Sequence, residues 1–227
     1  HYKFTGSGAV YTGWYVGEDG LYYYDQQGFC LTDTGKKLSG YWYYFQKDGK
    51  MLSSGWREKD GSHYYYDAQG HLILNAGMKI DGYWYYLDGN GRRYESQFRQ
   101  KGADWYYYDE EGHLVLNRDM KIGKYRYIFQ NNGAAYRGLK TENGKVIGFT
   151  PLGRQAFDDG VKDGNDWYYF DADGVMKQNS FRQKNGQSFY YDGEGHLVLN
   201  EELDINGKHY KSVSYTHLRA HETCADL

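Results

Sequence analysis

The chain lacks most of the features that stabilise or localise ordinary domains. Its 227 residues include two cysteines and one proline, and no apolar run approaches the length that spans a membrane. The formal net charge is −3, so there is no excess of Lys and Arg to neutralise a phosphate backbone. These absences argue against a disulfide scaffold, membrane insertion and nucleic-acid binding.

Aromatic residues are abundant where aliphatic residues are sparse. Leu, Ile and Val are too few for a thick core, whereas 28 tyrosines contribute to an aromatic share of 19%. Tyr and Trp rings can cover one another while a polar edge stays in water. The composition therefore favours a thin aromatic core.

A glycine recurs every 21 residues, except for one step of 20 between Gly133 and Gly153. Three residues before each glycine comes Asp, Gln or, once, Thr, and an aromatic run precedes that position. Self-similarity at a fixed period is typical of repeat proteins, in which neighbouring units complete each other's core. The phased glycines are Gly28, Gly49, Gly70, Gly91, Gly112, Gly133, Gly153, Gly174 and Gly195.

One repeat, residues 97–117, shows how each unit is expected to fold. The run from Trp105 to Tyr108 is strand-prone and lies between two turn-forming segments. Gly112 supplies the residue for which a positive φ is least costly. We therefore predict an all-β fold, a β-solenoid of stacked β-hairpins with about 21 residues per repeat, forming one monomeric array over residues 1–211.

A second rhythm of two repeats overlies the first. Gly-His-Leu, a hydrophobic residue and Leu-Asn recur at 70–75, 112–117 and 195–200, so we expect a pair of unlike hairpins as the true unit. Gly138 to Arg154 loses the aromatic cluster but keeps the phase. This indicates a weakened repeat rather than a domain boundary.

Residues 212–227 depart from the pattern. Val213 to Thr223 reads as the translation of a common transposase sequencing adapter, so we predict that this segment is not native. Its cluster of His217, His221 and Cys224 is accordingly not interpreted as a metal site. The chain begins at His1 within the repeat pattern, and we expect it to be a piece of a larger protein.

One position of the aromatic run, here called the tryptophan position, varies more than a core position would. It holds Trp in some repeats and Leu, His, Arg or Ser in others, which suggests a surface that binds ligand in some repeats only. Flat rings stack on the C–H faces of sugars, and Arg, Lys and Gln donate to hydroxyls. Packing between repeats explains the tryptophans nearly as well. The predicted ligand-binding residues are Trp42, Tyr44, Trp56, Trp84, Tyr86, Arg99, Gln100, Lys101, Trp105, Tyr107, Trp167, Tyr169, Gln183 and Lys184.

The recurring acidic residues do not indicate an enzyme. Paired carboxylates cleave glycosides, but these aspartates are phase-locked with the turns, and turn formation explains them. We predict no catalytic residue, cofactor or metal in this chain. His71, His113 and His196 repeat with the scaffold, so packing or capping is expected of them.

The segments Gly40 to Phe45, Gly82 to Asp88 and Asp166 to Gly174 resemble the cell-wall-binding and glucan-binding YG repeats of Gram-positive surface proteins. The resemblance extends to about Lys211 and implies a secreted or wall-associated array of stacked hairpins, with ligand sites between neighbours.

Choline-binding members of this group look like repeated Gly-Trp followed by Trp-Tyr-Tyr, which builds aromatic boxes around a quaternary ammonium. Here Phe98 and Phe181 replace the tryptophan of that doublet, which is expected to break most boxes. The glucan-binding repeats of glucansucrases look closer. We therefore predict a non-catalytic module that binds α-glucan, with a glucansucrase as parent. A choline- or teichoic-acid-binding wall attachment module and a structural spacer are the alternatives.

Overall fold

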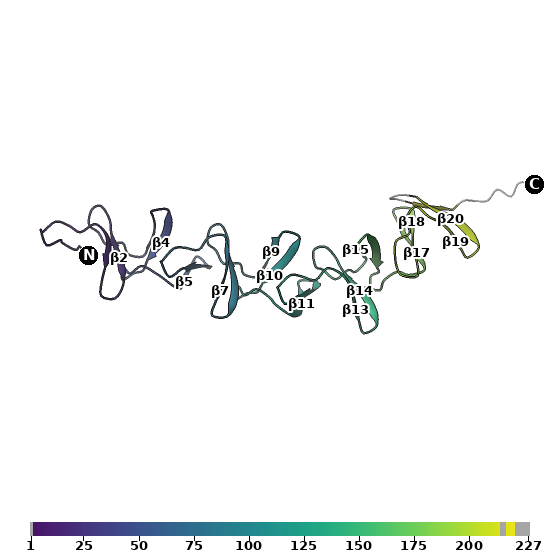
Figure 1. The fold of residues 1–227 in the computed structure, drawn as a ribbon, viewed down its shortest axis with the longest axis horizontal. Helices are drawn as coiled ribbons and strands as arrows, with labels where there is room; N and C mark the ends of the chain where they lie inside the picture. The colour runs from purple at the N-terminus through teal and green to yellow at the C-terminus, as the bar shows by residue number, and fades with distance from the viewer. Residues whose placement is uncertain (1, 214–216, 221–227) are drawn as a thin grey trace, which may run out of the picture. The chain divides into compact units, whose positions relative to one another are not determined.

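The computed structural model describes the backbone of residues 2–213 and 217–220, and every regular element among them is a β-strand (Figure 1). Residue contacts divide the chain into two units. The first unit is His1–Gln97 with Tyr108–Leu114, and the second is Phe98–Tyr107 with Val115–Leu227. No long apolar helix of the kind that crosses a membrane occurs in the described part of the chain.

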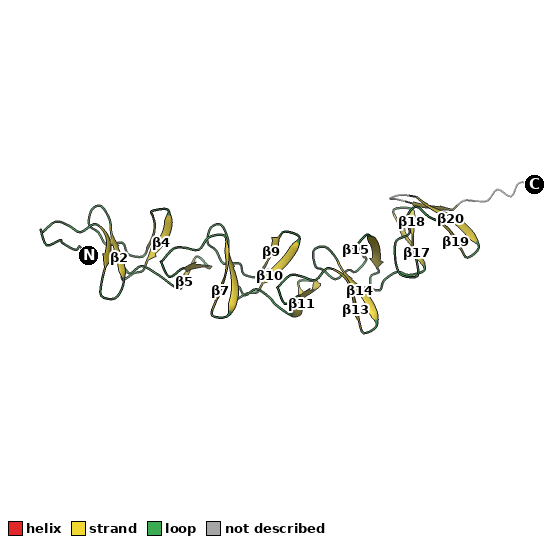
Figure 2. Cartoon of the chain, in the orientation of Figure 1, coloured by secondary structure: helices red, strands yellow, loops and turns green. Residues whose placement is uncertain are grey.

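Consecutive strands of the first unit pair as antiparallel hairpins joined by loops (Figure 2). Its strands are β1 (Gly13–Val16), β2 (Leu21–Tyr24), β3 (Thr34–Leu38), β4 (Tyr41–Phe45), β5 (Gly55–Lys59), β6 (Ser62–Tyr66), β7 (Ala76–Ile80) and β8 (Tyr83–Leu87).

The second unit continues in the same way, with β9 and β10 lying mostly within it. Its strands are β9 (Gln97–Lys101), β10 (Asp104–Tyr108), β11 (Arg118–Ile122), β12 (Tyr125–Phe129), β13 (Gly138–Glu142), β14 (Lys145–Phe149), β15 (Asp159–Asp163), β16 (Asp166–Phe170), β17 (Ser180–Lys184), β18 (Gln187–Tyr191), β19 (Glu202–Ile205), β20 (Lys208–Val213) and β21 (His217–Ala220). The described residues thus form ten hairpins, which confirms the predicted all-β fold and its spacing.

The phased aspartates form turns, as predicted. Asp67 Oδ1 accepts hydrogen bonds from the backbone N–H groups of Gln69 and His71, at 2.9 and 2.8 Å. Gly70, with φ +77°, closes the turn, and a Cβ there would lie 2.5 Å from Met51 Sδ. The glycine is needed both for its φ and for the close approach of the methionine.

The linker that follows each hairpin makes backbone hydrogen bonds both to that hairpin and to the hairpin that precedes it. In the first unit the Leu72 N–H donates to the Trp42 carbonyl at 2.8 Å, and the Ile73 N–H donates to the Tyr65 carbonyl at 2.9 Å. The linker therefore lies between two consecutive hairpins and satisfies backbone groups of both.

In the nine hairpins from β1–β2 to β17–β18, the last residue of the second strand is buried and forms the core. Phe45 and Leu87 in the first unit, and Phe149 and Phe170 in the second, are fully buried. This is the face predicted to be buried from strand alternation. The core is accordingly thin and aromatic, with about one large side chain per hairpin at its centre.

The weakened repeat keeps its hairpin. Strands β13 and β14 pair with Gly138 opposite Phe149, the register of the other hairpins. Gly148 stands where most other repeats carry Tyr, and the Phe170 ring lies 2.2 Å from the place of its absent Cβ. A neighbouring phenylalanine thus fills the space that a tyrosine would occupy.

Strand β21 pairs with β20 and lies in the segment predicted to be non-native. The rest of that segment, residues 214–216 and 221–227, includes His221 and Cys224 and lies outside the described residues. That the segment is an artefact stays a prediction.

Candidate ligand-binding cages

Three aromatic rings from two neighbouring hairpins form what we call the first cage. Trp14 and Tyr23 face each other across β1 and β2, and Tyr43 comes from β4 of the next hairpin. The Trp14 ring centroid lies 5.2 Å from that of Tyr23 and 5.0 Å from that of Tyr43, with interplanar angles of 82° and 70°. Rings at such angles form adjoining walls, the geometry with which proteins surround a quaternary ammonium.

The same arrangement recurs at every second hairpin except in the weakened region. The first rings Trp14, Trp56 and Phe98 follow at intervals of 42 residues, and Phe181 comes 83 residues after Phe98, beyond the weakened region. The centroid distances in the later cages are 4.8–5.2 Å, with interplanar angles of 63–64° in the second cage and 43–53° in the third and fourth. The second cage, in the first unit, is Trp56, Tyr65 and Tyr85. The third and fourth, in the second unit, are Phe98, Tyr107 and Tyr127, and Phe181, Tyr190 and Tyr210.

The prediction that Phe98 and Phe181 break most of the boxes stays a prediction, but both phenylalanines keep two neighbouring rings. Phe98 keeps centroid distances of 4.8 Å to Tyr107 and 5.0 Å to Tyr127, so a phenylalanine takes the tryptophan's place in the wall. The face of a Phe ring also attracts cations, although less strongly than that of Trp. The third and fourth cages therefore keep three adjacent rings, with a phenylalanine as the first.

The cages differ from the predicted site chiefly in their third ring. Tyr43, Tyr85 and Tyr127 are at most 8% exposed and belong to the face assigned to the core by alternation, so they are not among the predicted ligand residues. The Gly-Trp doublets together with the 42-residue rhythm were the signal that could have found these sites. Of the predicted ligand residues, the structure places Trp56 and Tyr107 in cages.

Between the cages, an arginine covers a tyrosine. The Arg57 guanidinium carbon lies 3.7 Å from the ring centroid of Tyr44 in the first unit, and Arg182 lies 3.6 Å from that of Tyr169 in the second. The hydroxyl of Tyr44 also donates to Asp33. Tyr86, at the same position, is 8% exposed and donates to Asn75 Oδ1 at 2.5 Å. These predicted ligand residues make their contacts inside the array.

Three of the predicted tryptophans are open to solvent. Trp42, Trp84 and Trp167 are 44–45% exposed. Trp42 borders a groove of about 590 Å³ whose lining includes Tyr64, Arg57, Lys59 and Asn90. Trp167 borders a groove of about 480 Å³ in the second unit. Trp105, by contrast, packs against the Tyr127 and Phe129 cluster.

The predicted polar ligand residues lie on the first strands of their hairpins. The Gln100 amide donates to the Gly102 carbonyl at 3.1 Å, and the Gln183 amide donates to Ser188 Oγ at 2.6 Å. Lys101 and Lys184 are exposed, and Arg99 is half-buried. The two amides thus hydrogen-bond within their own hairpins.

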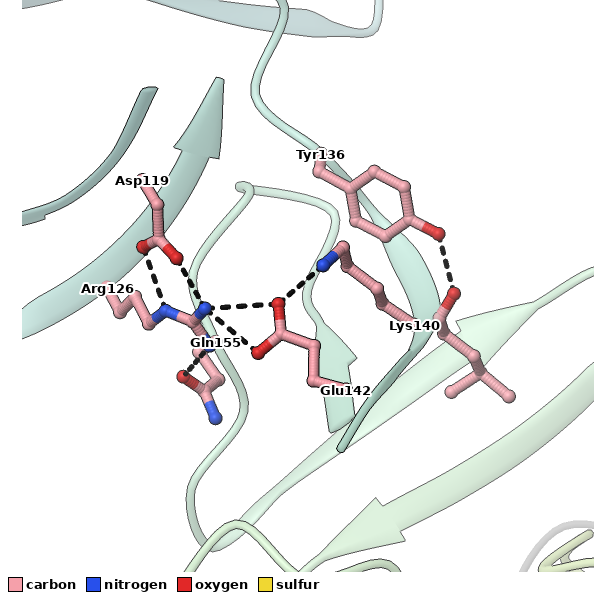
Figure 3. Close-up of polar contacts among 7 residues, drawn as sticks. Asp119, Arg126, Tyr136, Lys140, Glu142 and Gln155 are labelled. Carbon is pink, nitrogen blue, oxygen red and sulfur yellow. Dashed lines mark hydrogen bonds and ion pairs between the residues drawn. The ribbon is translucent and has the colours of Figure 1, made fainter. Parts of the chain in front are cut away.

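An ion-pair network replaces aromatic packing where Arg126 holds the tryptophan position (Figure 3). Its Nη2 donates to Asp119 Oδ2 at 2.5 Å and to Glu142 Oε2 at 2.9 Å, and Lys140 Nζ donates to Glu142 Oε1 at 2.5 Å. The Arg126 guanidinium lowers the pKa of Asp119, and Lys140 followed by Arg126 lowers the pKa of Glu142. The network ties β11–β12 to β13–β14 and has a structural role.

Two turns bring possible metal ligands together. Asp109, Glu111 and His113 hold ligand atoms within 4.8 Å of one another, as do Asp192, Glu194 and His196. The turn itself accounts for the first group, because Asp109 Oδ1 accepts the His113 N–H and His113 Nε2 bonds to the Tyr85 hydroxyl at 2.9 Å. The His113 ring also stacks on Tyr83 at 3.9 Å, which confirms the packing role predicted for it.

Comparison with known proteins gives a family model and several structures. The family model described as "Putative cell wall binding repeat" matches residues 36–51, 79–92 and 161–176. No curated protein sequence matches the chain. Choline binding protein F of Streptococcus pneumoniae has a similar structure, with a TM-score of 0.57 and 22% identity over 96% of this chain and 89% of that one.

Two larger proteins also match. The modular autolysin LytC of Streptococcus pneumoniae matches with a TM-score of 0.57 and 21% identity over 92% of this chain, which spans 46% of the autolysin. An alternansucrase in complex with isomaltononaose matches at 27% identity over 93% of this chain and 17% of the enzyme, but its TM-score of 0.42 is too low to support the predicted glucansucrase parent. Three segments of the chain are therefore similar to a cell wall binding repeat, and its hairpin fold is similar to that of choline binding protein F of Streptococcus pneumoniae.

Proposed function

We propose that this chain is a non-catalytic attachment module that binds quaternary ammonium groups, such as the choline of wall polymers, in its aromatic cages. The observation that carries the proposal is the recurrence, at four places along the chain, of three aromatic rings at centroid distances of 4.8–5.2 Å. Choline, the ligand in the name of the structurally similar choline binding protein F, is a quaternary ammonium and agrees with this chemistry. Such a module would act at the cell surface.

The expected affinity of one cage is low. A cation against an aromatic face gains about 0.5–2 kcal/mol, so three rings supply a few kcal/mol. This corresponds to dissociation constants on the order of 1 mM. Several cages on one chain would act together on a polymer through effective concentration. Weak single sites are thus compatible with firm attachment to a wall.

Trp14 offers a direct test, since it is the outermost wall of the first cage at 37% exposure. Choline binding measured by calorimetry on the whole chain should show millimolar affinity, and Trp14→Ala should remove about one site. Trp42→Ala is the matched control, because Trp42 is similarly exposed but lies outside the cages. Unchanged stoichiometry in Trp14→Ala, with the fold intact, would contradict the proposal.

A second candidate function is α-glucan binding, favoured by the groove at Trp42. An exposed indole beside Tyr64, Arg57, Lys59 and Asn90 combines a stacking surface with donors for sugar hydroxyls. Affinity electrophoresis in native gels containing dextran tests it. Retardation that Trp42→Ala abolishes and Trp14→Ala preserves would support glucan binding and a glucansucrase parent. A chain that responds to neither choline nor dextran would be a spacer.

A further inference from the structure

The second cage carries a cation of its own. The guanidinium carbon of Arg93 lies 5.0 Å from the Trp56 ring centroid and 5.8 Å from the Tyr85 ring centroid. In the first cage the equivalent position, 42 residues earlier, is Met51, an uncharged side chain packed with Tyr43. The two positions match in backbone pairing as well, because Met51 bridges to Phe45 and Arg93 to Leu87.

Arg93 is held in place rather than free to swing away. Its Nε donates to Glu95 Oε1 at 2.8 Å, and that same oxygen lies 2.7 Å from His63 Nδ1. Only 13% of the Arg93 side chain is exposed. A Cβ on Gly112 would lie 2.6 Å from Nε, so this glycine leaves the room that the arginine occupies.

The first cage has none of these polar groups. Leu21, Met51 and Ser53 stand 42 residues before His63, Arg93 and Glu95 respectively. The first and second cages therefore have equivalent rings and differ in the residues at these three surrounding positions. A quaternary ammonium entering the second cage would meet ring faces already engaged by a guanidinium and would be repelled by its charge.

We propose that Arg93 closes the second cage to quaternary ammonium ligands from within, so that the first cage is the open one of the first unit. The inference rests on the proposed function, because it concerns which cages accept that ligand. Arg93 is then a residue that determines specificity, and Glu95 and His63 position it.

The test follows the two tryptophans separately. The indole N–H signals of Trp14 and Trp56 are assigned in the whole chain with Trp14→Phe and Trp56→Phe, and choline is titrated. In the unchanged chain we expect the Trp14 signal to shift and the Trp56 signal to stay. In Arg93→Met combined with Glu95→Ser, which reproduces Met51 and Ser53, both signals should shift with similar midpoints. Arg93→Lys, which retains a cation, should leave Trp56 silent.

The reverse exchange guards against a variant that simply unfolds. Met51→Arg combined with Ser53→Glu should abolish the Trp14 response. Near-ultraviolet circular dichroism and the melting temperature report the fold of every variant, and Arg93→Leu is a second opening variant because Leu72 and Leu114 occupy the same repeat position.

Each outcome separates the two proposals. Two results overturn the role of Arg93 and leave the proposed function standing. In the first, the Trp56 signal of the unchanged chain shifts with the same midpoint as the Trp14 signal. In the second, the Trp14 signal responds in folded opening variants but the Trp56 signal does not. In a third possible result, the Trp14 signal never responds to choline and the Trp56 signal responds only in the variants that replace Arg93. This result supports Arg93 as the closing residue and removes the first cage from the proposed function. No response in any folded variant overturns both.

Discussion

Phe45 lies beneath the first cage, and its removal tests whether the thin core supports that site. The side chain is fully buried, and its ring centroid lies 5.9 Å from that of Trp14 and 6.2 Å from that of Tyr23. Truncating a buried Phe to Ala costs about 3–5 kcal/mol through lost burial and the cavity left behind. Phe45→Leu should cost about 1 kcal/mol, because Leu87 fills the same repeat position elsewhere in the unit.

In a repeat array this loss should appear locally, since each hairpin contacts mainly its neighbours. Amide hydrogen exchange of β4 and of the linker after it is the suitable assay. A loss of about 3 kcal/mol speeds exchange from locally opened states roughly 10²-fold. Phe45→Ala should therefore accelerate exchange across Tyr41–Phe45 by about that factor and weaken choline binding at the first cage. Phe29→Ala is the control, as Phe29 is 48% exposed in the same unit. An acceleration in Phe45→Ala no greater than that of the control would refute the reasoning.

Three further expectations concern charge, backbone and cage strength. Because the folded-state pKa values of Asp119 and Glu142 are lowered, their stabilising contribution is complete above the ordinary carboxyl pKa and is lost as pH falls through the lowered values. Urea midpoints should therefore fall below about pH 4, less steeply in Asp119→Asn, and a parallel decline in both proteins would contradict this. Gly70→Ala should destabilise the fold by about 2 kcal/mol or more in thermal melts, because φ is +77° and the added carbon meets a methionine sulfur. Gly61→Ala is the control, since it adds only the φ strain. Equal losses of stability in the two variants would show that packing against the methionine is irrelevant. Phe181→Trp should raise choline affinity of the fourth cage roughly twofold, because Trp is the stronger partner of a cation, and an unchanged isotherm would count against that cage.

The hairpins could be predicted from the sequence because their determinants are local. A phased aspartate, a glycine with positive φ and a strand-prone aromatic run all lie within one repeat, and the weakened repeat kept its phase. The burial of Phe45 and Leu87 followed from strand alternation alone.

The cages could not be predicted in full because each needs a ring from the following hairpin. Alternation correctly placed Tyr43 on the buried face, but gave no sign that it would also stand 5.0 Å from Trp14. Replacement of Trp by Phe98 suggested a broken box. In the structure the phenylalanine ring, although smaller than an indole, still lies 4.8 Å from the Tyr107 ring. Arg93 is a linker residue that reaches back over the preceding strands to the Trp56 ring, and no periodicity within one repeat encodes this contact.

The alternation of unlike hairpins restricts how a gene for such an array can change in length. A cage takes two rings from one class of hairpin and the third from the other class, 42 residues forming one complete pair. Unequal recombination that gains or loses a full pair keeps every junction between a hairpin that supplies two rings and a hairpin that supplies the third. Recombination offset by a single hairpin places two hairpins of the same class side by side and eliminates the cage at that junction. Related arrays should therefore differ in length mainly by even numbers of hairpins, and each pair gained or lost should change the number of cages by one.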